Sequence, residues 1–121
     1  SAALARVGPS KVATIAALGE PVLRLYFEIG VATLPPEAQT ELDRVAEQVR
    51  AGSAIVIISG FHDASGDAAR NAELAKQRAL AVHHALGANG VAPDRLELSK
   101  PALTMGGADA KEARRVEIHL R

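Results

Sequence analysis

The chain of 121 residues contains no cysteine and no tryptophan, and it has only one tyrosine and two phenylalanines. Without cysteine it has no disulfide framework, no thiolate nucleophile and no zinc-cysteine site. Three aromatic residues leave no platform on which the bases of a single strand could stack. Its 14 basic side chains are balanced by 14 acidic ones. Capture of nucleic acid or of an anionic membrane by bulk charge is therefore excluded as well.

A long apolar run is also missing from the start of the sequence. Residues 1–20 are interrupted by Arg6, Gly8, Pro9 and Lys11, whereas a membrane-spanning helix needs about 20 mostly apolar residues. The unbroken apolar core of a secretory signal is lacking too. Because the sequence begins with Ser, we expect a piece or a processed product of a longer protein, with any membrane anchor outside it. The first 20 residues are predicted to be an N-terminal extension or the remnant of a linker.

The remaining residues, 21–121, have the properties of one compact domain. A hydrophobic share of 48% is too high for a disordered chain, and the length suits a single domain. Continuous or alternating apolar runs predict strands, and apolar residues at i, i+3, i+4 and i+7 predict helices. The predicted strands cover residues 22–27, 54–58, 96–99 and 116–120, and the predicted helices cover residues 35–52 and 67–86.

This order of elements, β-α-β-α-β-β, predicts the fold class: an α/β (α+β type) two-layer sandwich. A mixed four-stranded sheet would carry the two main helices on one face. Thr33 is the expected cap of the first helix and Asp67 that of the second, and Asn89-Gly90 is the expected stop of the second helix. Residues 101–110 are expected to be a loop. The alternation of the last strand predicts that His119 points outward.

A charged residue lies where the second helix should be apolar. At about 100° per residue, Arg78 falls between Leu74 and Val82, which face the core. A guanidinium at the border of a buried stripe is costly unless it is paired and hydrogen-bonded. Asn71 lies on the same strip, about 10 Å earlier along the axis. Arg78 therefore needs a partner, and the sequence offers one close to the start of the helix.

That partner is Asp63, in the expected turn of residues 60–66 between the central strand and the second helix. Ligands in open α/β sheets collect at the carboxyl ends of strands, and backbone N–H groups at a helix N-terminus bind anions. Asp63 and Arg78 together would suit a zwitterionic ligand. The structural alternative is an Asp–Arg bridge that pins the turn to the helix.

Three segments resemble the OmpA-like C-terminal domain family, which includes outer-membrane protein A, Pal and MotB. They read Gly-Phe-His-Asp at residues 60–63, Asn-Ala-Glu-Leu-Ala-Lys-Gln-Arg-Ala at 71–79 and Arg-Arg-Val at 114–116. The family signature is roughly G-H-T-D-x-x-G-x(4)-N-x-x-L-S-x-x-R-A with a later N-R-R-V. The spacings from Asp63 to Asn71 and from Asn71 to Arg78 match without gaps. The resemblance covers about residues 22–121, including a first strand and loop at residues 25–30.

The resemblance implies a non-catalytic module that binds peptidoglycan through the diaminopimelate of the peptide stem. It implies no cofactor and no bound metal, and it places the chain in the periplasm or cell envelope, tethered to a membrane by a segment outside this sequence. Arg78 would hold a carboxylate of diaminopimelate, and Asp63 would take the ammonium directly or through the turn that it organises. Asn71 would brace the loop, and Arg114 would either contact the ligand or support Asp63. The further ligand-binding residues implied are backbone donors at Ala64, Ser65 and Gly66, the pocket-bordering Glu28 and Ile29, and His62 at the rim.

Several positions depart from the family pattern. Phe61-His62 replaces His-Thr, Ala75 replaces Ser, and Ala113 replaces the Asn before the two arginines. These changes motivate an alternative function, a diverged protein–protein interaction domain that has lost peptidoglycan binding. His62 either tunes binding between pH 5 and 8 or is an ordinary loop histidine. The Ala-rich first segment could dock on another domain or on a second copy, which would give a homodimer.

Overall fold

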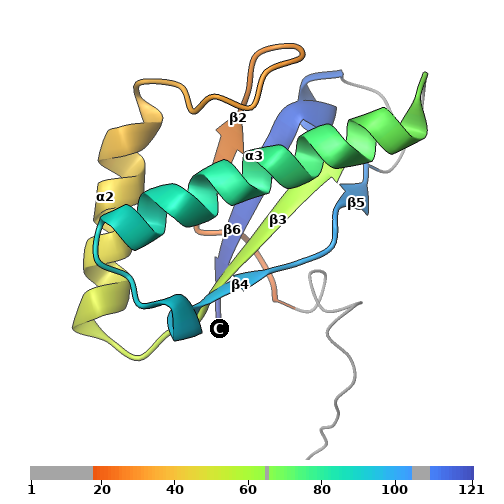
Figure 1. The fold of residues 1–121 in the computed structure, drawn as a ribbon. Helices are drawn as coiled ribbons and strands as arrows, with labels where there is room; N and C mark the ends of the chain where they lie inside the picture. The colour runs from red at the N-terminus through yellow and green to blue at the C-terminus, as the bar shows by residue number, and fades with distance from the viewer. Residues whose placement is uncertain (1–17, 65, 105–109) are drawn as a thin grey trace, which may run out of the picture.

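The computed structural model of the protein describes residues 18–64, 66–104 and 110–121. The predicted extension of residues 1–20 therefore lies almost entirely outside the described residues, as does Ser65. Figure 1 shows two helices, α2 and α3, lying on the same side of a sheet. The elements in chain order are β2 (Leu23–Tyr26), α2 (Ala38–Ala51), β3 (Val56–His62), α3 (Ala68–Ala88), β4 (Leu96–Leu98), β5 (Ala102–Leu103) and β6 (Arg115–Leu120). Short 3-10 helices, η2 (Pro93–Arg95) and η3 (Ala110–Arg114), precede β4 and β6.

The sheet is mixed, and its strand order is β2-β6-β3-β4, with β5 also paired to β3. Strand β6 runs antiparallel to both β2 and β3, whereas β4 and β5 run parallel to β3. The predicted two-layer sandwich with both helices on one face is thus confirmed. The sheet has five strands rather than four, because the two residues of β5 lie within the segment expected to be a loop.

The core fills the space between this sheet and the helices. The buried apolar side chains of β3 and β6 that face the helices sit at every second position, as a strand with one covered face requires. They pack against the apolar stripes of both helices. The main contributors are Leu25, Leu42, Val49, Val56, Ile58, Val82, Leu86, Val116 and Ile118. This packing fixes the two helices relative to the carboxyl end of β3, where the proposed ligand site lies.

Strand β3 is longer than the sequence pattern indicates. It runs to His62 rather than to Ile58, so Gly60, Phe61 and His62 are strand residues and not part of a turn. Gly60 pairs with Val116 of β6, and the next two residues pair with β5. Added strand partners therefore extend β3 beyond its apolar run.

The start of α2 also differs from the prediction. The helix begins at Ala38 after Glu37, so Thr33 lies too far upstream to cap it. The amide of Ala38 donates to the carbonyl oxygen of Pro35 at 3.0 Å, which forms a turn ahead of the helix. Because Pro36 disfavours the helical conformation at Pro35, the helix cannot begin as early as the first proline.

The start of α3 agrees with the prediction. Asp67 has an extended backbone, and its side-chain oxygen Oδ1 accepts the amide hydrogen of Arg70 at 3.1 Å. This bond satisfies one of the amide groups that the first turn of a helix leaves without a partner. The helix ends at Ala88, and Asn89 caps it before Gly90, whose φ is +92°. The cap and the stop signal were both correctly predicted.

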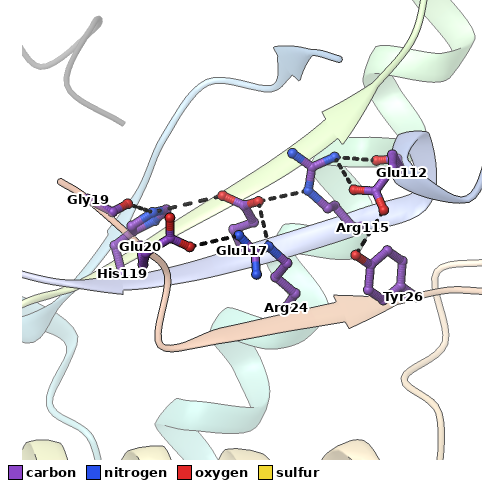
Figure 2. Close-up of polar contacts among 8 residues, drawn as sticks. All are labelled: Gly19, Glu20, Arg24, Tyr26, Glu112, Arg115, Glu117 and His119. Carbon is purple, nitrogen blue, oxygen red and sulfur yellow. Dashed lines mark hydrogen bonds and ion pairs between the residues drawn. The ribbon is translucent and has the colours of Figure 1, made fainter. Parts of the chain in front are cut away.

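The prediction that His119 points into solvent is wrong. His119 does lie on the face opposite the helices, but it is only 1% exposed. Its Nε2 lies 3.2 Å from the carbonyl oxygen of Gly19, and Glu117 is buried beside it (Figure 2). The alternation of β6 was therefore read correctly, whereas the assumption that its second face meets water was not.

A network of charged side chains explains how Glu117 is tolerated on this face. One of its oxygens, Oε2, accepts a hydrogen bond from Arg115 Nε at 2.8 Å and another from Arg24 Nε at 3.4 Å (Figure 2). Arg115 also pairs with Glu112, which accepts the hydroxyl hydrogen of Tyr26 at 3.1 Å. A buried carboxylate is stable only with such partners. The network joins β2, β6 and η3.

Within the described residues, no helix combines the length and the apolar character needed to cross a membrane. The same part of the chain contains no group of three or more histidine, aspartate or glutamate side chains arranged to hold a metal ion.

Candidate ligand-binding site

A hollow of about 360 Å³ opens at the carboxyl end of β3. Its walls come from the loop after β2, the β3–α3 connection, the first half of α3, and η3. Seven of the ten ligand-binding residues expected from the sequence line it: Ile29, His62, Asp63, Gly66, Asn71, Arg78 and Arg114. The structure therefore brings together residues that are as much as 85 positions apart in the sequence.

Two of the other three expected residues are not among the side chains that line the hollow. Ala64 is exposed and does not line the hollow. The side chain of Glu28 does not line it either, but the backbone carbonyl of Glu28 contacts Arg78. Ser65 lies outside the described residues, so its expected role as a backbone donor stays a prediction.

Arg78 is almost completely buried, with 3% of its surface exposed. Its Nε donates to the carbonyl oxygen of Val31 at 2.8 Å, and its Nη2 donates to that of Glu28 at 3.0 Å. The guanidinium carbon also lies 5.4 Å from the centre of the Phe27 ring, a distance suited to a cation–π contact. Arg78 thus holds the loop after β2 against α3.

The expected partner of Arg78 was Asp63, and both side chains line the hollow. The hydrogen bonds of Arg78 described above go instead to carbonyls of a loop that the sequence did not indicate as a partner. A guanidinium has five N–H donors in a fixed plane, and the loop carbonyls take two of them. Helical periodicity indicated correctly that Arg78 needs partners, but it could not show that a distant loop supplies them.

Arg114 is the second cation of the hollow. Its Nε donates to the carbonyl oxygen of Phe27 at 2.9 Å, next to the loop that Arg78 holds. Burial lowers the pKa of Arg78 from its usual value, and the positive charge of Arg114 lowers it further. An arginine nevertheless stays charged in proteins. The two guanidinium groups therefore make a region in which an anion relieves their mutual repulsion.

The carboxylates and amide of the hollow come from the start of α3 and the turn before it. Asp63 and Asn71 both line the hollow, and both residues are engaged in interactions within the protein. Asp67, which was expected only as a helix cap, lines it as well. The site thus presents anionic and cationic groups to the same space, as a zwitterionic ligand requires.

Sequence reasoning missed several small or apolar residues of the lining. Gly30 has a φ of +71°, which an ordinary side chain would disfavour, so a lone glycine after a predicted strand was an available signal. Leu74 was assigned to the core, yet it is only half-buried and borders the hollow. Ala110 and Ala113 carry no chemical signal, and only the folded position of η3 places them there.

Comparison with known proteins gives the class of protein to which this fold and hollow belong. The sequence model of the OmpA family matches residues 26–117. The chain is 36% identical over 77 residues to the peptidoglycan-associated lipoprotein of Pseudomonas putida, which covers 64% of this chain and 46% of that protein. It is 33% identical over 102 residues to outer membrane protein A of Bordetella avium, covering 78% of this chain and 53% of that protein.

Solved structures support the same fold. The crystal structure of the peptidoglycan-associated lipoprotein from Burkholderia pseudomallei superposes with a TM-score of 0.70 at 24% identity, over 81% of this chain and 89% of that chain. The C-terminal domain of Helicobacter pylori MotB gives a TM-score of 0.67 at 20% identity, over 83% and 84% of the two chains. The chain therefore belongs to the OmpA family. It spans about half the length of the curated relatives it matches.

Proposed function

We propose that this chain is a non-catalytic peptidoglycan-binding module of the cell envelope. It would anchor a membrane-associated protein to the cell wall by recognising the diaminopimelate of the peptide stem. The observation that carries the proposal is the hollow in which Arg78, Arg114 and Asp63 meet. The names of its relatives support it, because they include a peptidoglycan-associated lipoprotein and an outer membrane protein.

Each charged group has a role in this proposal. The carbonyls of Val31 and Glu28 take the N–H of Nε and one N–H of Nη2 of Arg78, so the two N–H groups of Nη1 and the second one of Nη2 are left for a ligand carboxylate. Arg114 adds positive charge from η3. Asp63 takes the ammonium group of the same ligand, directly or through the turn that it organises. Charge-assisted hydrogen bonds of this kind are about twice as strong as neutral ones.

The remaining lining groups would complete the site. Asn71 would brace the β3–α3 connection, and the backbone around Ala64, Ser65 and Gly66 would offer N–H donors near the start of α3. Ile29 is 79% exposed at the rim, where it can cover the aliphatic part of a bound stem peptide. Burial of that apolar surface would add to the affinity.

One observation favours a second function, a protein–protein interaction domain that keeps the fold without the ligand. Two hydrogen bonds to the loop after β2 already give Arg78 a structural role. A chain that had lost peptidoglycan binding would still need Arg78 for this purpose. Binding and stability must therefore be measured separately for the same variants.

The direct test is co-sedimentation of the chain with purified sacculi, together with calorimetric titration with meso-diaminopimelic acid. We expect the wild type to bind both. The variant Arg78→Ala should weaken binding by about tenfold or more, because it removes a charge-assisted contact. Asp63→Asn should also weaken binding while leaving the loop bonds of Arg78 in place.

Arg44→Ala is the matched control, since Arg44 is an exposed arginine of α2 that does not line the hollow. It should bind as the wild type does. Melting temperatures of all variants separate lost binding from lost folding. If the wild type binds neither probe while a peptidoglycan-associated lipoprotein does, the proposed function is wrong. Unchanged affinity in a folded Arg78→Ala variant would assign Arg78 to the fold alone.

A further inference from the structure

We propose that His62 contacts the ligand in this hollow and that binding of an anionic ligand takes up a proton on its imidazole. This inference rests on the proposed function and adds a property to it, an affinity that rises as the solution becomes more acidic. It is carried by the position of His62 in the same hollow as Arg114 and by the hydrogen bond of its Nδ1.

His62 and Arg114 lie at the same end of two neighbouring strands. Strands β3 and β6 pair antiparallel as far as Gly60 opposite Val116. His62 ends β3, and Arg114, the last residue of η3, directly precedes β6. The guanidinium carbon of Arg115 lies 3.8 Å from the centre of the Phe61 ring, so the two strand ends stay in contact beyond their last paired residues. Both His62 and Arg114 line the hollow.

The hydrogen bond of His62 determines how its ring responds to a proton. Nδ1 lies 3.1 Å from the carbonyl oxygen of Asp63. A carbonyl can only accept, so Nδ1 carries the hydrogen, and in the neutral ring Nε2 holds a lone pair. The contact with Asp63 uses Nδ1, which leaves Nε2 as the ring nitrogen for a ligand. Protonation therefore changes Nε2 from an acceptor, which repels an anion, into a charged donor.

The charged groups that share the hollow with His62 come from three segments. The β3–α3 connection contributes Asp63 and Asp67, α3 contributes Arg78, and η3 contributes Arg114. The residue of β5 opposite His62 is the uncharged Leu103. Two carboxylates and two guanidinium groups balance in formal charge, so an imidazolium makes the hollow positive.

A ligand carboxylate is attracted by a charged imidazole and not by a neutral one. A carboxylate bound within reach of Nε2 therefore favours the imidazolium. Linkage requires the converse: if ligand favours protonation, protonation favours ligand by the same factor. Affinity is therefore highest at acidic pH and falls as pH rises, by at most about tenfold per pH unit for a single proton. Histidine is the side chain whose ordinary titration falls between pH 5 and 8.

The test is isothermal titration of the whole chain with meso-diaminopimelic acid at about pH 5.5, 6.5 and 7.5, the range in which histidine titrates. Each titration is run in two buffers with different heats of ionisation, so that the protons taken up on binding are counted. The amino and carboxyl groups of this probe keep their charges in that range. We expect affinity to rise about fivefold or more from the highest to the lowest pH, with net proton uptake.

His62→Gln should bind with an affinity that does not depend on pH and without proton uptake. His84→Gln is the matched control, because His84 is an exposed histidine of α3 outside the hollow, and it should behave as the wild type. Wild-type binding that is independent of pH, or pH dependence that survives in His62→Gln, overturns this inference alone. Failure of the wild type to bind at any pH, with a peptidoglycan-associated lipoprotein as positive control, overturns the proposed function as well.

Discussion

At position 78, one guanidinium stabilises the fold and faces the ligand site. Two of its nitrogen atoms, Nε and Nη2, donate to carbonyls of the loop after β2, and only 3% of the residue is exposed. The same loop supplies Ile29 and Gly30 to the lining of the hollow. Arg78 therefore controls the shape of the site even before any ligand enters it.

Replacing Arg78 with lysine separates charge from geometry. Lysine keeps the positive charge but lacks the planar set of donors that reaches both carbonyls. We expect Arg78→Lys to lower the free energy of unfolding by about 1–3 kcal/mol, measured by urea denaturation. Amide hydrogen exchange should also speed up in the loop, most clearly at Val31, whose amide donates to the carbonyl oxygen of Glu28. Unchanged exchange at Val31 would contradict the anchoring role of Arg78.

Single residues also show where sequence reasoning succeeds. Asp67 was correctly predicted as a cap because its partner, the amide of Arg70, is only three residues away. The partners of Arg78 lie 47 and 50 residues away, and no local pattern indicates them. The prediction that His119 points into solvent failed for a similar reason. The alternating pattern of β6 shows on which face of the sheet His119 lies, but not which residues cover that face. Local chemistry was predictable, and distant contacts were not.

At the level of the elements, α3 and β3 lie in close contact at Gly60. A Cβ atom added there would lie 3.0 Å from the backbone carbonyl carbon of Ala75, and closer still to its oxygen. Helix backbone cannot move aside as a flexible side chain can. Gly60 thus sets the distance between the helix layer and the sheet beside the hollow.

Gly60→Ala should therefore destabilise the protein, by about 1–3 kcal/mol as expected for an overpacked site. Gly87→Ala is the matched control in α3, because nothing lies within 4 Å of its added Cβ. The control should stabilise the protein by about 0.5–1 kcal/mol, since alanine favours helix more than glycine does. Urea denaturation of both variants gives the comparison. Equal effects of the two substitutions would show that the close approach is unimportant.

The predicted boundaries of the elements were accurate where they depend on neighbours in the sequence. The end of α3 at Asn89-Gly90 is such a case. The end of β3 is not, because Phe61 and His62 are strand residues through their pairing with β5. Periodicity correctly indicated the order of the elements. The family resemblance indicated seven residues that line the hollow, since it carries information about folded neighbours that periodicity lacks.

For the whole molecule, Tyr26 provides a probe of the folded state. It is the single tyrosine of a chain without tryptophan, so the ultraviolet absorbance of phenolate reports on Tyr26 alone. Burial raises its pKa, and the hydrogen bond to Glu112 raises it further. Because Tyr26 belongs to β2 and Glu112 to η3, the titration of the Tyr26 phenol depends on the contact between these two elements.

We expect the phenol to titrate at higher pH in the native protein than in the urea-unfolded chain, where tyrosine titrates near pH 10. The native state then holds this proton more tightly. Its contribution to stability is complete below the unfolded value and is lost as pH rises through the folded value. Glu112→Gln should shift the native midpoint downward. Identical midpoints for native and unfolded chains would contradict the observed contact.

The position of β6 has a consequence for the time course of folding. It is the last of the described strands along the chain, yet it lies between β2 and β3. Its pairing with β2 joins Arg24 to Glu117, 93 residues later. During synthesis, β2 therefore lacks the one strand partner that it has among the described residues until residues 115–120 have emerged. Contacts of such large separation slow folding because a long loop must close first, so the sheet forms late and its two halves assemble together.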